Sequence, residues 1–557
     1  MFVRYVSYLI VAGWTTIFLV ANAYGGTPIA GTLDLTTSIN QGVAPTVDTC
    51  TAAGWSRDPN NTGATWVDFY ANAPYGQPGS IYVGGTIANL FRADLPFADK
   101  NHGFSITFPI NFPLDPGAYP SWNSMADGRT YNLYAYGLAL SPLSNTALLQ
   151  ATPKPIKCVT NVKHSTFGPL GLIGTGQGDD STRIQNAINA SGANSLIYIP
   201  SGTYMLGTSH RNGIDVGSYS QDVADYSASC SSVLGTPIET ALVISNPNVR
   251  LVGEASGSAW PVLKLMAQTK LRILSVAPTA TGAGAANLVF DGNKANRVFS
   301  SNLGWPCGYV VDTLIINWLN PSANYSNIES RNGMEDGFGC WHCTSLSISS
   351  SSFHDNGTLY AGGSGVSIIG QNATVSTSTM TGNTGPGVWI NGDVGSPGSV
   401  SNISVTNSMI QNNLAAGVSV GSVSSASSPS HITISSNTFS GNAAGIGTGP
   451  FAAIWIVNAT NGTVSGNTVT DNANGIFIDG ASTSWNINSN NVSSTTAQHL
   501  QQSGIWIRGN QVSGIQVTSN TVQRNGGSVS AQIIVDSTVP SGAVNSNWST
   551  ANTIGWW

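Results

Sequence analysis

The stretches ISVTNSMIQNNLAAGVSV (403–420), ITISSNTFSGNAAGIGTG (432–449) and GTVSGNTVTDNANGIFIDG (462–480) follow one pattern. Each copy has short runs of alternating apolar residues separated by Asn and Gly. Two Asn positions recur at intervals of 30 residues, the first as Asn407, Asn437 and Asn467 and the second as Asn412, Asn442 and Asn472. A repeat of this kind predicts a solenoid in which each coil buries its apolar face on the next. Stacked Asn side chains would hydrogen-bond along its axis, so we expect them to be structural.

Length and composition agree with a repetitive all-β protein. The chain has 557 residues, which is too long for one ordinary domain unless the architecture repeats. Charged residues make up 8% and apolar residues 41%, which argues against a disordered chain. The net charge is −6 and no run of Lys or Arg occurs. Nucleic acid and anionic membrane surfaces are therefore not expected as partners.

The N-terminus predicts export. Arg4, an apolar stretch and the sequence ANA at 21–23 have the form of a signal peptide of residues 1–23. The mature protein is then expected to be secreted, extracellular or periplasmic, and free of the membrane. An uncleaved anchor helix is the alternative, because the apolar stretch is nearly long enough to span a bilayer.

Six cysteines fit an oxidising compartment. For Cys340 and Cys343 in CWHC, structural disulfides are favoured over zinc, because no second pair completes a zinc site, and the six cysteines leave fifteen pairings open.

The remaining chain divides into two architectures. Residues 24–158 contain alternating stretches such as TWVDFYA and GFSITFPI, separated by Pro, Gly, Asn and Asp. They predict a small antiparallel β-sandwich, and they resemble an accessory module of secreted bacterial proteins. Residues 159–557 contain the repeats. At 174–206 the sequence GTGQGDDSTRIQNAINASGANSLIYIPSGTYML predicts a helix capped by Asp180 or Ser181, with Ile184, Ala187 and Ile188 on its apolar face.

This opening segment resembles the pectate-lyase-like superfamily of right-handed parallel β-helices. In that superfamily a Gly-Asp-rich turn leads into an amphipathic helix, and an apolar-Pro-x-Gly-x-Tyr strand follows. The resemblance covers roughly residues 167–540. It implies that the helix caps the open N-terminal end of the coils. The expected fold is therefore an all-β, right-handed parallel β-helix preceded by a β-sandwich.

Ionisable residues concentrate in RNGMEDG (331–337) and SSSFHDNG (350–357). Aligned at a spacing of 19 residues, these segments would place Glu335 beside His354 and Asp336 beside Asp355. Neighbouring strands lie about 4.8 Å apart, so the carboxylates would raise one pKa and keep a proton available. We predict Asp336, Asp355, Glu335 and His354 as catalytic residues and Arg331 as substrate-binding. The alternative is that the Asp and His residues only shape turns.

The polygalacturonase family of this superfamily offers a partial match. It uses Asn-Thr-Asp, an Asp-Asp pair one coil on, then Gly-His-Gly and Arg-Ile-Lys. Here Glu335–Asp336 resembles the acid pair and His354 follows about one coil later, but the other motifs are missing. Galacturonide specificity does not carry over. Pectate lyases use a basic residue with calcium, which Arg331 with Glu335 and Asp336 would imitate.

Aromatic residues recur in the segments GVWING, AIWIVN, GIFIDG and GIWIRG. Alternation places the flanking aliphatic residues inward and the aromatic rings outward along one face. The predicted substrate-binding row is Trp389, Trp455, Phe477 and Trp506. Such a row suits stacking against sugar rings. Packing beneath a loop and a subunit contact are the alternatives.

These features lead to one functional hypothesis and two rivals. The first is a secreted enzyme that degrades a polysaccharide, as a glycoside hydrolase with a carboxylate pair on adjacent coils. The second is a polysaccharide lyase or C5-epimerase acting on uronates. The third is a non-catalytic glycan-binding or adhesin β-helix, because fold alone does not decide activity. No metal or other cofactor is expected for hydrolysis, whereas a lyase would admit calcium. The expected partner is the polysaccharide, and the sequence predicts no oligomeric state.

Overall fold

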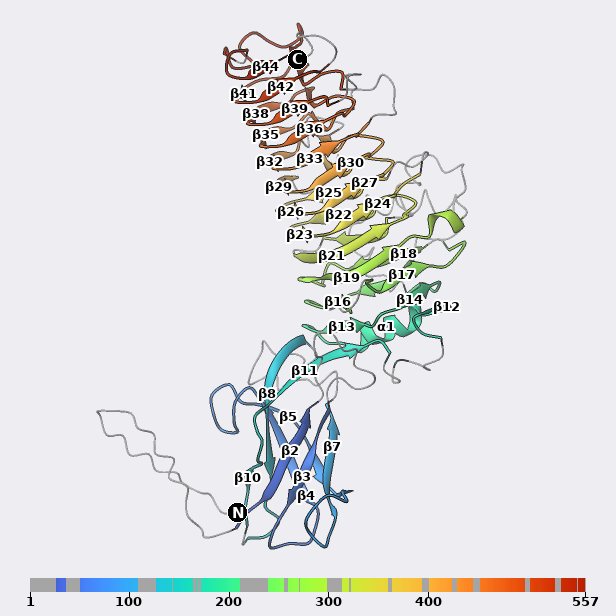
Figure 1. Cartoon of the computed structure of the whole chain (residues 1–557), viewed down its shortest axis with the longest axis vertical. Helices are drawn as coiled ribbons and strands as arrows, with labels where there is room; N and C mark the ends of the chain where they lie inside the picture. Colours follow the sequence, from blue (N-terminus) through green and yellow to red (C-terminus); the bar gives the residue numbers. More distant parts are fainter. Residues whose placement is uncertain are drawn as a thin grey trace, which may run out of the picture. The chain divides into compact units, whose positions relative to one another are not determined.

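The computed structural model (Figure 1) describes most of the chain after residue 26. The described residues are 27–36, 51–108, 127–142, 144–163, 167, 172–210, 239–254, 259–269, 271–297, 313–319, 322–358, 363–392, 400–422, 428–443, 451–495, 501–525, 532–547 and 549–555. The predicted signal peptide lies outside them. No helix in these ranges is long and apolar enough to cross a membrane.

The chain separates into two compact units, one made mostly of residues before Lys154 and one made mostly of Pro155–Trp557. The first unit holds the antiparallel sheets that the alternating stretches predicted. One sheet has the order β2 (Ala30–Thr36), β3 (Thr51–Arg57), β7 (Asn101–Thr107) and β6 (Leu90–Phe91). In the other, β4 (Thr65–Ala71) pairs with β5 (Ile81–Ala88) and β8 (Asp127–Gly137), and β8 also pairs with β10 (Ala147–Leu148). β1 (Thr27–Pro28) and β9 (Ser144–Asn145) form a separate parallel pair.

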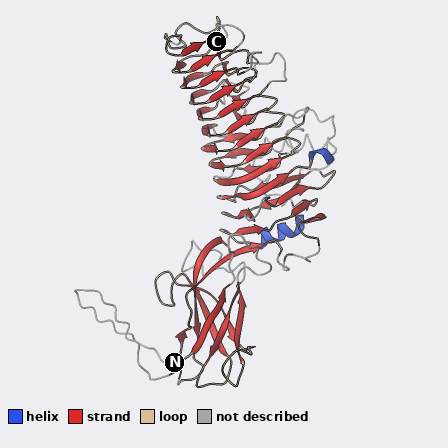
Figure 2. Cartoon of the chain, viewed as in Figure 1, coloured by secondary structure: helices blue, strands red, loops and turns tan. Residues whose placement is uncertain are grey.

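The second unit is a parallel β-helix whose coils each cross three sheets (Figures 1 and 2). Sheet A has eleven strands: β15 (Glu239–Ile244), β18 (Leu271–Val276), β20 (Ile315–Trp318), β22 (Phe338–Cys343), β25 (Val366–Gly370), β28 (Val388–Gly392), β31 (Val418–Ser422), β34 (Ile454–Val457), β37 (Ile476–Asp479), β40 (Ile505–Ile507) and β43 (Ile533–Val535).

Sheets B and C follow sheet A in each coil and share two long strands that bend from one sheet into the other, β19 (Ala283–Asp291) and β21 (Ala323–Arg331). Sheet B also contains β11 (Lys154–Asn161), β13 (Leu196–Ile199), β16 (Arg250–Gly253), β23 (Leu346–Ser349), β26 (Ala373–Ser376), β29 (Ser401–Thr406), β32 (Ser430–Ser435), β35 (Thr460–Ser465), β38 (Thr483–Asn488) and β41 (Gln516–Thr518). Sheet C also contains β12 (Thr175–Asp179), β14 (Thr203–Leu206), β17 (Val262–Leu265), β24 (Ser352–His354), β27 (Thr379–Thr381), β30 (Met409–Gln411), β33 (Thr438–Ser440), β36 (Thr468–Thr470), β39 (Asn491–Ser493), β42 (Thr521–Gln523) and β44 (Thr553–Gly555). The inward side chains of all three sheets form one continuous apolar core.

Helix α1 (Ser181–Ala190) occupies the first coils, as predicted, and buries Ile184, Ala187 and Ile188. The predicted cap is not formed by the Asp180 side chain. Asp180 is the N-cap residue by position, but its carboxylate accepts the N–H groups of Gly174 and Met205 at 3.2 Å. It therefore ties the first strands together instead of capping the helix.

Two polar ladders fix the corners of the coils. At the corner between sheets C and A, Asn383, Asn413, Asn442 and Asn472 donate and accept in series, with side-chain distances of 2.8–2.9 Å. At the corner between sheets B and C, Asn437, Asn467, Asn490 and Asn520 do the same at 2.9–3.1 Å.

The structural interpretation of the Asn repeat is confirmed, with a correction of one residue. Asn407 and Asn412 precede the ladders and have left-handed backbone angles, φ 50° and 54°. Ser408 and Asn413 take the ladder positions in their coil. The left-handed conformation tolerates Asn better than most residues, so two neighbouring polar positions in each corner have different roles.

Candidate functional site

The predicted ionisable cluster divides between two sheets. Strand β21 pairs with β24 so that Arg331 lies beside His354. The next corner agrees, because Gly333 donates its N–H to the Asn356 side chain, which is 23 residues further along the chain. The predicted spacing of 19 residues is therefore wrong.

Glu335 and Asp336 consequently do not stack on His354 and Asp355. Both acids lie at the corner that leads into β22 of sheet A. His354 ends a strand of sheet C, and Asp355 follows it. The proposed combination of Arg331 with Glu335 and Asp336 does not form either.

The Asp336 side chain is buried at the corner that leads into sheet A. It is 2% exposed, and its Oδ1 accepts the N–H of Ser364 at 2.5 Å. The Ser364 and Ser367 side chains also hydrogen-bond to this carboxyl. Burial outweighs these hydrogen bonds and raises the pKa of Asp336 from 3.8 to about 6. A carboxyl in this condition holds its proton closer to neutrality than an exposed one, as a general acid must.

Glu335 is equally buried, with 1% exposure, and its Oε2 accepts the hydroxyl of Thr313 at 3.2 Å. The Glu335 side chain is therefore buried at the same corner of the coil as Asp336. Sequence reasoning identified both acids but missed Ser364 and Ser367, since nothing in their sequence context distinguishes them from the other serines of the repeat.

His354 belongs to a different ionic network, on the outer face of sheet C. Its Nδ1 lies 2.7 Å from Asp355 Oδ2 and its Nε2 lies 3.2 Å from Glu329 Oε1. Both partners are acceptors, so both ring nitrogens donate only when the imidazole is protonated. The hydrogen bond to Glu329, followed by the one to Asp355, therefore raises the pKa of His354. The same contact with His354 lowers the pKa of Glu329.

Arg331 belongs to the same ionic network and is paired with two carboxylates. Its guanidinium contacts Glu329 at 2.6 Å and Asp291 at 3.2 Å. Glu329 and Asp291 were missed from the sequence, although the alternation in β21 places Glu329 and Arg331 on the same outer face.

Asp355 has a backbone role that the turn interpretation anticipated. Its φ is 57°, and its side chain is 60% exposed. The equivalent corner positions are taken by residues that also have positive φ, namely Asn332, Gly382, Asn412, Gly441 and Asp471. Asp355 therefore occupies a left-handed turn position that Asn, Gly or Asp can fill.

The aromatic residues form one row on the outer side of sheet A. The register joins Trp389 to Ser419, Ser419 to Trp455, Trp455 to Phe477 and Phe477 to Trp506. Their aliphatic neighbours lie in the core, so the predicted outward direction is confirmed. Exposure is not uniform along the row, however.

Phe477 is a correction to the predicted platform, because it is fully buried. The ring of Trp506 lies over it at 4.8 Å between centroids, with 31° between the planes. The guanidinium of Arg508 lies 5.0 Å from the same ring and pairs with Asp479. Packing therefore covers Phe477 at this end of the row. The alternative of packing beneath a loop is correct in that the ring is covered, but the covering side chains come from β40 and the residue after it.

The open end of the row is a cleft of about 210 Å³ between Trp389 and Trp455. Phe451 packs edge-on against Trp455, with ring centroids 5.9 Å apart. Ser419 lies between the two tryptophans, and Ser364 lines the cleft together with Gly, Ala and Pro residues. Because Ser364 also hydrogen-bonds to Asp336, the cleft and the buried acid are adjoining parts of one site.

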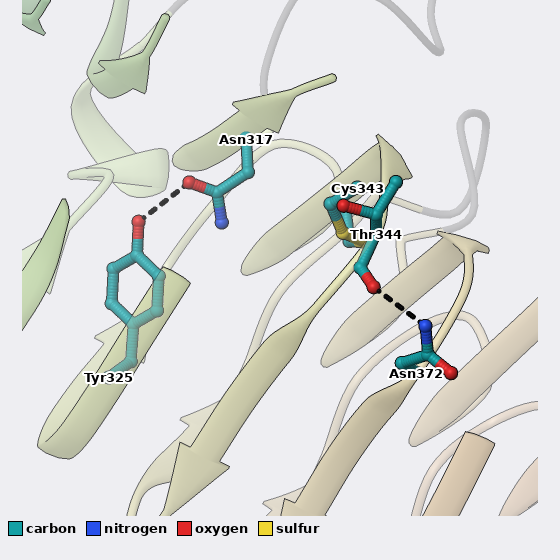
Figure 3. Close-up of a disulfide and its surroundings, with 6 residues drawn as sticks. Asn317, Tyr325, Cys343, Thr344 and Asn372 are labelled. Atoms are coloured by element: carbon teal, nitrogen blue, oxygen red, sulfur yellow. Dashed lines mark hydrogen bonds between the residues drawn. A yellow bond between two sulfur atoms is a disulfide. The ribbon is translucent and has the colours of Figure 1, made fainter. Parts of the chain in front are cut away.

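The two cysteines of CWHC form a disulfide with each other, a pairing that the sequence left open. Cys340 and Cys343 are joined within β22 (Figure 3). In the same view the hydroxyl of Tyr325 donates to Asn317 at 2.9 Å, and Asn372 donates to the Thr344 carbonyl at 3.0 Å. Among the described residues, no group of three or more His, Cys, Asp or Glu side chains is arranged to hold a metal ion.

Comparison with known families places the fold. Residues 160–391 match the family described as "Rhamnogalacturonase A/epimerase, pectate lyase-like", and residues 424–554 match "Right handed beta helix region". The chain carries a pectate-lyase-like right-handed parallel β-helix. The fold class predicted from the sequence is confirmed. The first match contains Asp336, Ser364 and Trp389. A comparison with curated proteins finds no match.

Three of the solved structures with a similar chain path are described as an epimerase, an exopolygalacturonase and a glucanase. The A-module of a mannuronan C-5 epimerase from Azotobacter vinelandii is 18% identical, with a TM-score of 0.46, over 71% of this chain and 98% of that one. A family 28 exopolygalacturonase from Yersinia enterocolitica is 12% identical, with a TM-score of 0.40, over 94% and 98%. The catalytic unit of an α-1,3-glucanase from Streptomyces thermodiastaticus is 13% identical, with a TM-score of 0.38, over 90% of each chain.

Proposed function

We propose that the protein is a secreted polysaccharide-degrading enzyme that binds its substrate on sheet A and hydrolyses glycosidic bonds there. The observation that carries the proposal is the junction of two features. A cleft walled by Trp389 and Trp455 shares Ser364 with a buried carboxyl, Asp336, whose pKa is about 6. Aromatic walls suit the apolar faces of sugar rings, and a protonated acid suits the departure of a glycosidic oxygen.

Proton transfer in this arrangement uses Ser364. Its hydroxyl hydrogen-bonds to Asp336 and its residue lines the cleft. In the proposed step the hydroxyl protonates the leaving glycosidic oxygen while it takes the proton of Asp336. Glu335, buried at the same corner, is the second carboxylate of the proposal. It either removes a proton from the attacking water or itself attacks the anomeric carbon of the sugar. Asp355 and His354 lie on sheet C and have no part in it.

A test of hydrolysis incubates the purified protein with a panel of polysaccharides, with calcium or with a chelator. New reducing ends are measured together with near-ultraviolet absorbance, which detects unsaturated products. We expect reducing ends without absorbance, in both media. Asp336→Asn should lower the rate by a factor on the order of 10²–10⁴, the usual contribution of general acid catalysis. Asp355→Asn, a matched control on sheet C, should leave the rate unchanged.

Two results would contradict the hydrolase. Unsaturated products that need calcium would identify a lyase acting on uronates. Equal rates for Asp336→Asn and the wild type would remove Asp336 from the chemistry.

Glycan binding without cleavage is the second candidate function. The burial of both acids and of Ser364, at 1–2% exposure, favours it, because a substrate in the cleft would reach these groups only if the corner opened. Retention of a polysaccharide by the protein, with no reducing ends released over long incubation, would support binding alone. In that case Asp336→Asn should retain the polysaccharide as well as the wild type does.

A further inference from the structure

Charge along the chain distinguishes the coils that build the cleft. Between Arg331 and Arg508 the sequence contains no Lys or Arg. The same interval contains six acids, Glu335, Asp336, Asp355, Asp393, Asp471 and Asp479. The residues that line the cleft are drawn from 363–455, well inside this interval. The interval itself therefore supplies no Lys or Arg to offset the negative formal charge of these acids.

Among the residues that the structure describes, none that lines the cleft is ionisable. Its described walls are aromatic, and its floor consists of Ser, Gly, Ala and Pro side chains. Three described cations that precede or follow this interval are already engaged. Arg508 pairs with Asp479 beyond the closed end of the aromatic row. Arg331 pairs with Glu329 and Asp291 on sheet C, and Lys294 donates to the backbone carbonyls of Asp355 and Gly357 there.

These observations constrain the sugar. A uronate carries a carboxylate on every ring, and moving it from water into an apolar cleft without a cation is costly. Asp336, which hydrogen-bonds to Ser364 beside the cleft, adds like-charge repulsion when it is ionised. An uncharged ring loses only hydroxyl hydration, and it gains contact with aromatic faces that need no charge.

The spacing of the walls fits a single ring. Trp389 and Trp455 flank Ser419 in register, so their backbones are separated by two strand spacings, about 9.6 Å. The small Ser419 side chain leaves the gap between them open. A pyranose ring at van der Waals distance, about 3.5–4.0 Å, from an aromatic side chain on each side needs about 7–8 Å, so the gap admits one ring.

We infer that this site takes an uncharged polysaccharide, with one neutral sugar ring held between Trp389 and Trp455, and that it excludes polyuronates. The inference rests on the proposed function of the cleft and specifies its substrate class. Recognition is by shape and stacking, with hydroxyl contacts to Ser419 and to backbone groups.

The test measures binding of the purified full chain to soluble polysaccharides by affinity electrophoresis and calorimetry. The neutral set contains glucans, mannans and galactans, and the acidic set contains polygalacturonate and alginate. We expect a neutral polymer to bind with an affinity that does not change between low and high salt. Trp389→Ala and Trp455→Ala should each weaken it by about tenfold, which corresponds to loss of one stacked ring. Trp66→Ala, at a half-exposed Trp of the β-sandwich, should leave it unchanged.

Two further variants keep the result interpretable if a Trp replacement harms folding. Trp389→Phe retains a ring and should lose less affinity than Trp389→Ala. Ser419→Lys places an ammonium group between the walls, and it should raise the affinity for polygalacturonate by about tenfold while it lowers that for the neutral polymer.

The outcomes separate the two claims. Binding of a polyuronate that is lost in both Trp→Ala variants would overturn the neutral-substrate inference and leave the cleft as the binding site. Binding of either class that survives both variants would overturn the inference by removing the cleft. Failure of every polymer to bind would overturn it together with the proposed function.

Discussion

Replacing Asp336 by Asn should stabilise the folded protein at pH 8 and leave its stability nearly unchanged at pH 4. The folded-state pKa of about 6 lies above the ordinary value of 3.8. For such a carboxyl the favourable contribution of the proton is fully present below pH 3.8 and is lost as the pH rises to about 6. The shift of about two units corresponds to about 3 kcal/mol of stability lost by the wild type at higher pH.

The Asn variant carries no charge at any pH, and its amide oxygen can still accept the N–H of Ser364. Its advantage over the wild type should therefore grow from near zero at pH 4 to about 3 kcal/mol at pH 8, with the change centred between 4 and 6. Denaturant unfolding followed by circular dichroism, at several pH values, measures this difference. A constant difference between the two proteins across that range would refute the view that Asp336 is a buried acid with a raised pKa.

Three other changes test separate parts of the structure. Asn442→Ala removes four side-chain hydrogen bonds, to Asn413 (two), Ile410 and Asn472, and should lower the unfolding free energy by about 3–4 kcal/mol; Asn412→Ala, at the adjacent turn position, should cost only about 1 kcal/mol, and equal losses would contradict the ladder assignment. His354→Gln should abolish the part of the stability that the wild type has below pH 6.5 and loses as the pH rises through the raised pKa of His354; an unchanged pH profile in unfolding experiments would show that the contacts with Glu329 and Asp355 do not hold the proton. Replacing Cys340 and Cys343 together by Ser should cost about 4–8 kcal/mol, because it removes about 2 kcal/mol from a very short disulfide loop and places two hydroxyls in the core at about 1–3 kcal/mol each; a loss below about 2 kcal/mol would contradict the burial of both side chains.

The fold was predictable because its determinants are local and repeated. Alternating apolar residues and Asn corners recur coil after coil, so each copy supports the same interpretation. The helix at 181–190 was predictable from its apolar face alone. The N-cap was not, since Asp180 hydrogen-bonds to strands whose position the local sequence does not specify.

The register of the ionisable residues could not be read in the same way, because each coil has two polar corners. The predicted spacing of 19 residues sets Asn332 beside Ser351, and this pairing wrongly equates a corner between sheets C and A with one between sheets B and C. Ser351 belongs to the ladder that continues through Ser378, whereas Asn332 has the left-handed conformation shared by Asp355. Ser and Asn serve at both corners, so composition does not distinguish them.

The sequence predicts which aromatic side chains point outward from sheet A. It does not predict which of them stay exposed or which buried acid adjoins the cleft. Alternation gives the outward direction of Trp389, Trp455, Phe477 and Trp506, because that depends only on the strand period. Burial of Phe477 depends on Trp506 and Arg508 from the following strand. The link between the cleft and Asp336 depends on Ser364, which is 28 residues away in sequence.

The proposed site is tested most directly by a crystal structure of the Asp336→Asn protein with an oligosaccharide of the polymer that binds best. We predict a sugar ring between Trp389 and Trp455, with the next glycosidic oxygen near Ser364. Sugar bound on sheet C beside His354 and Glu329, with the cleft empty, would contradict it.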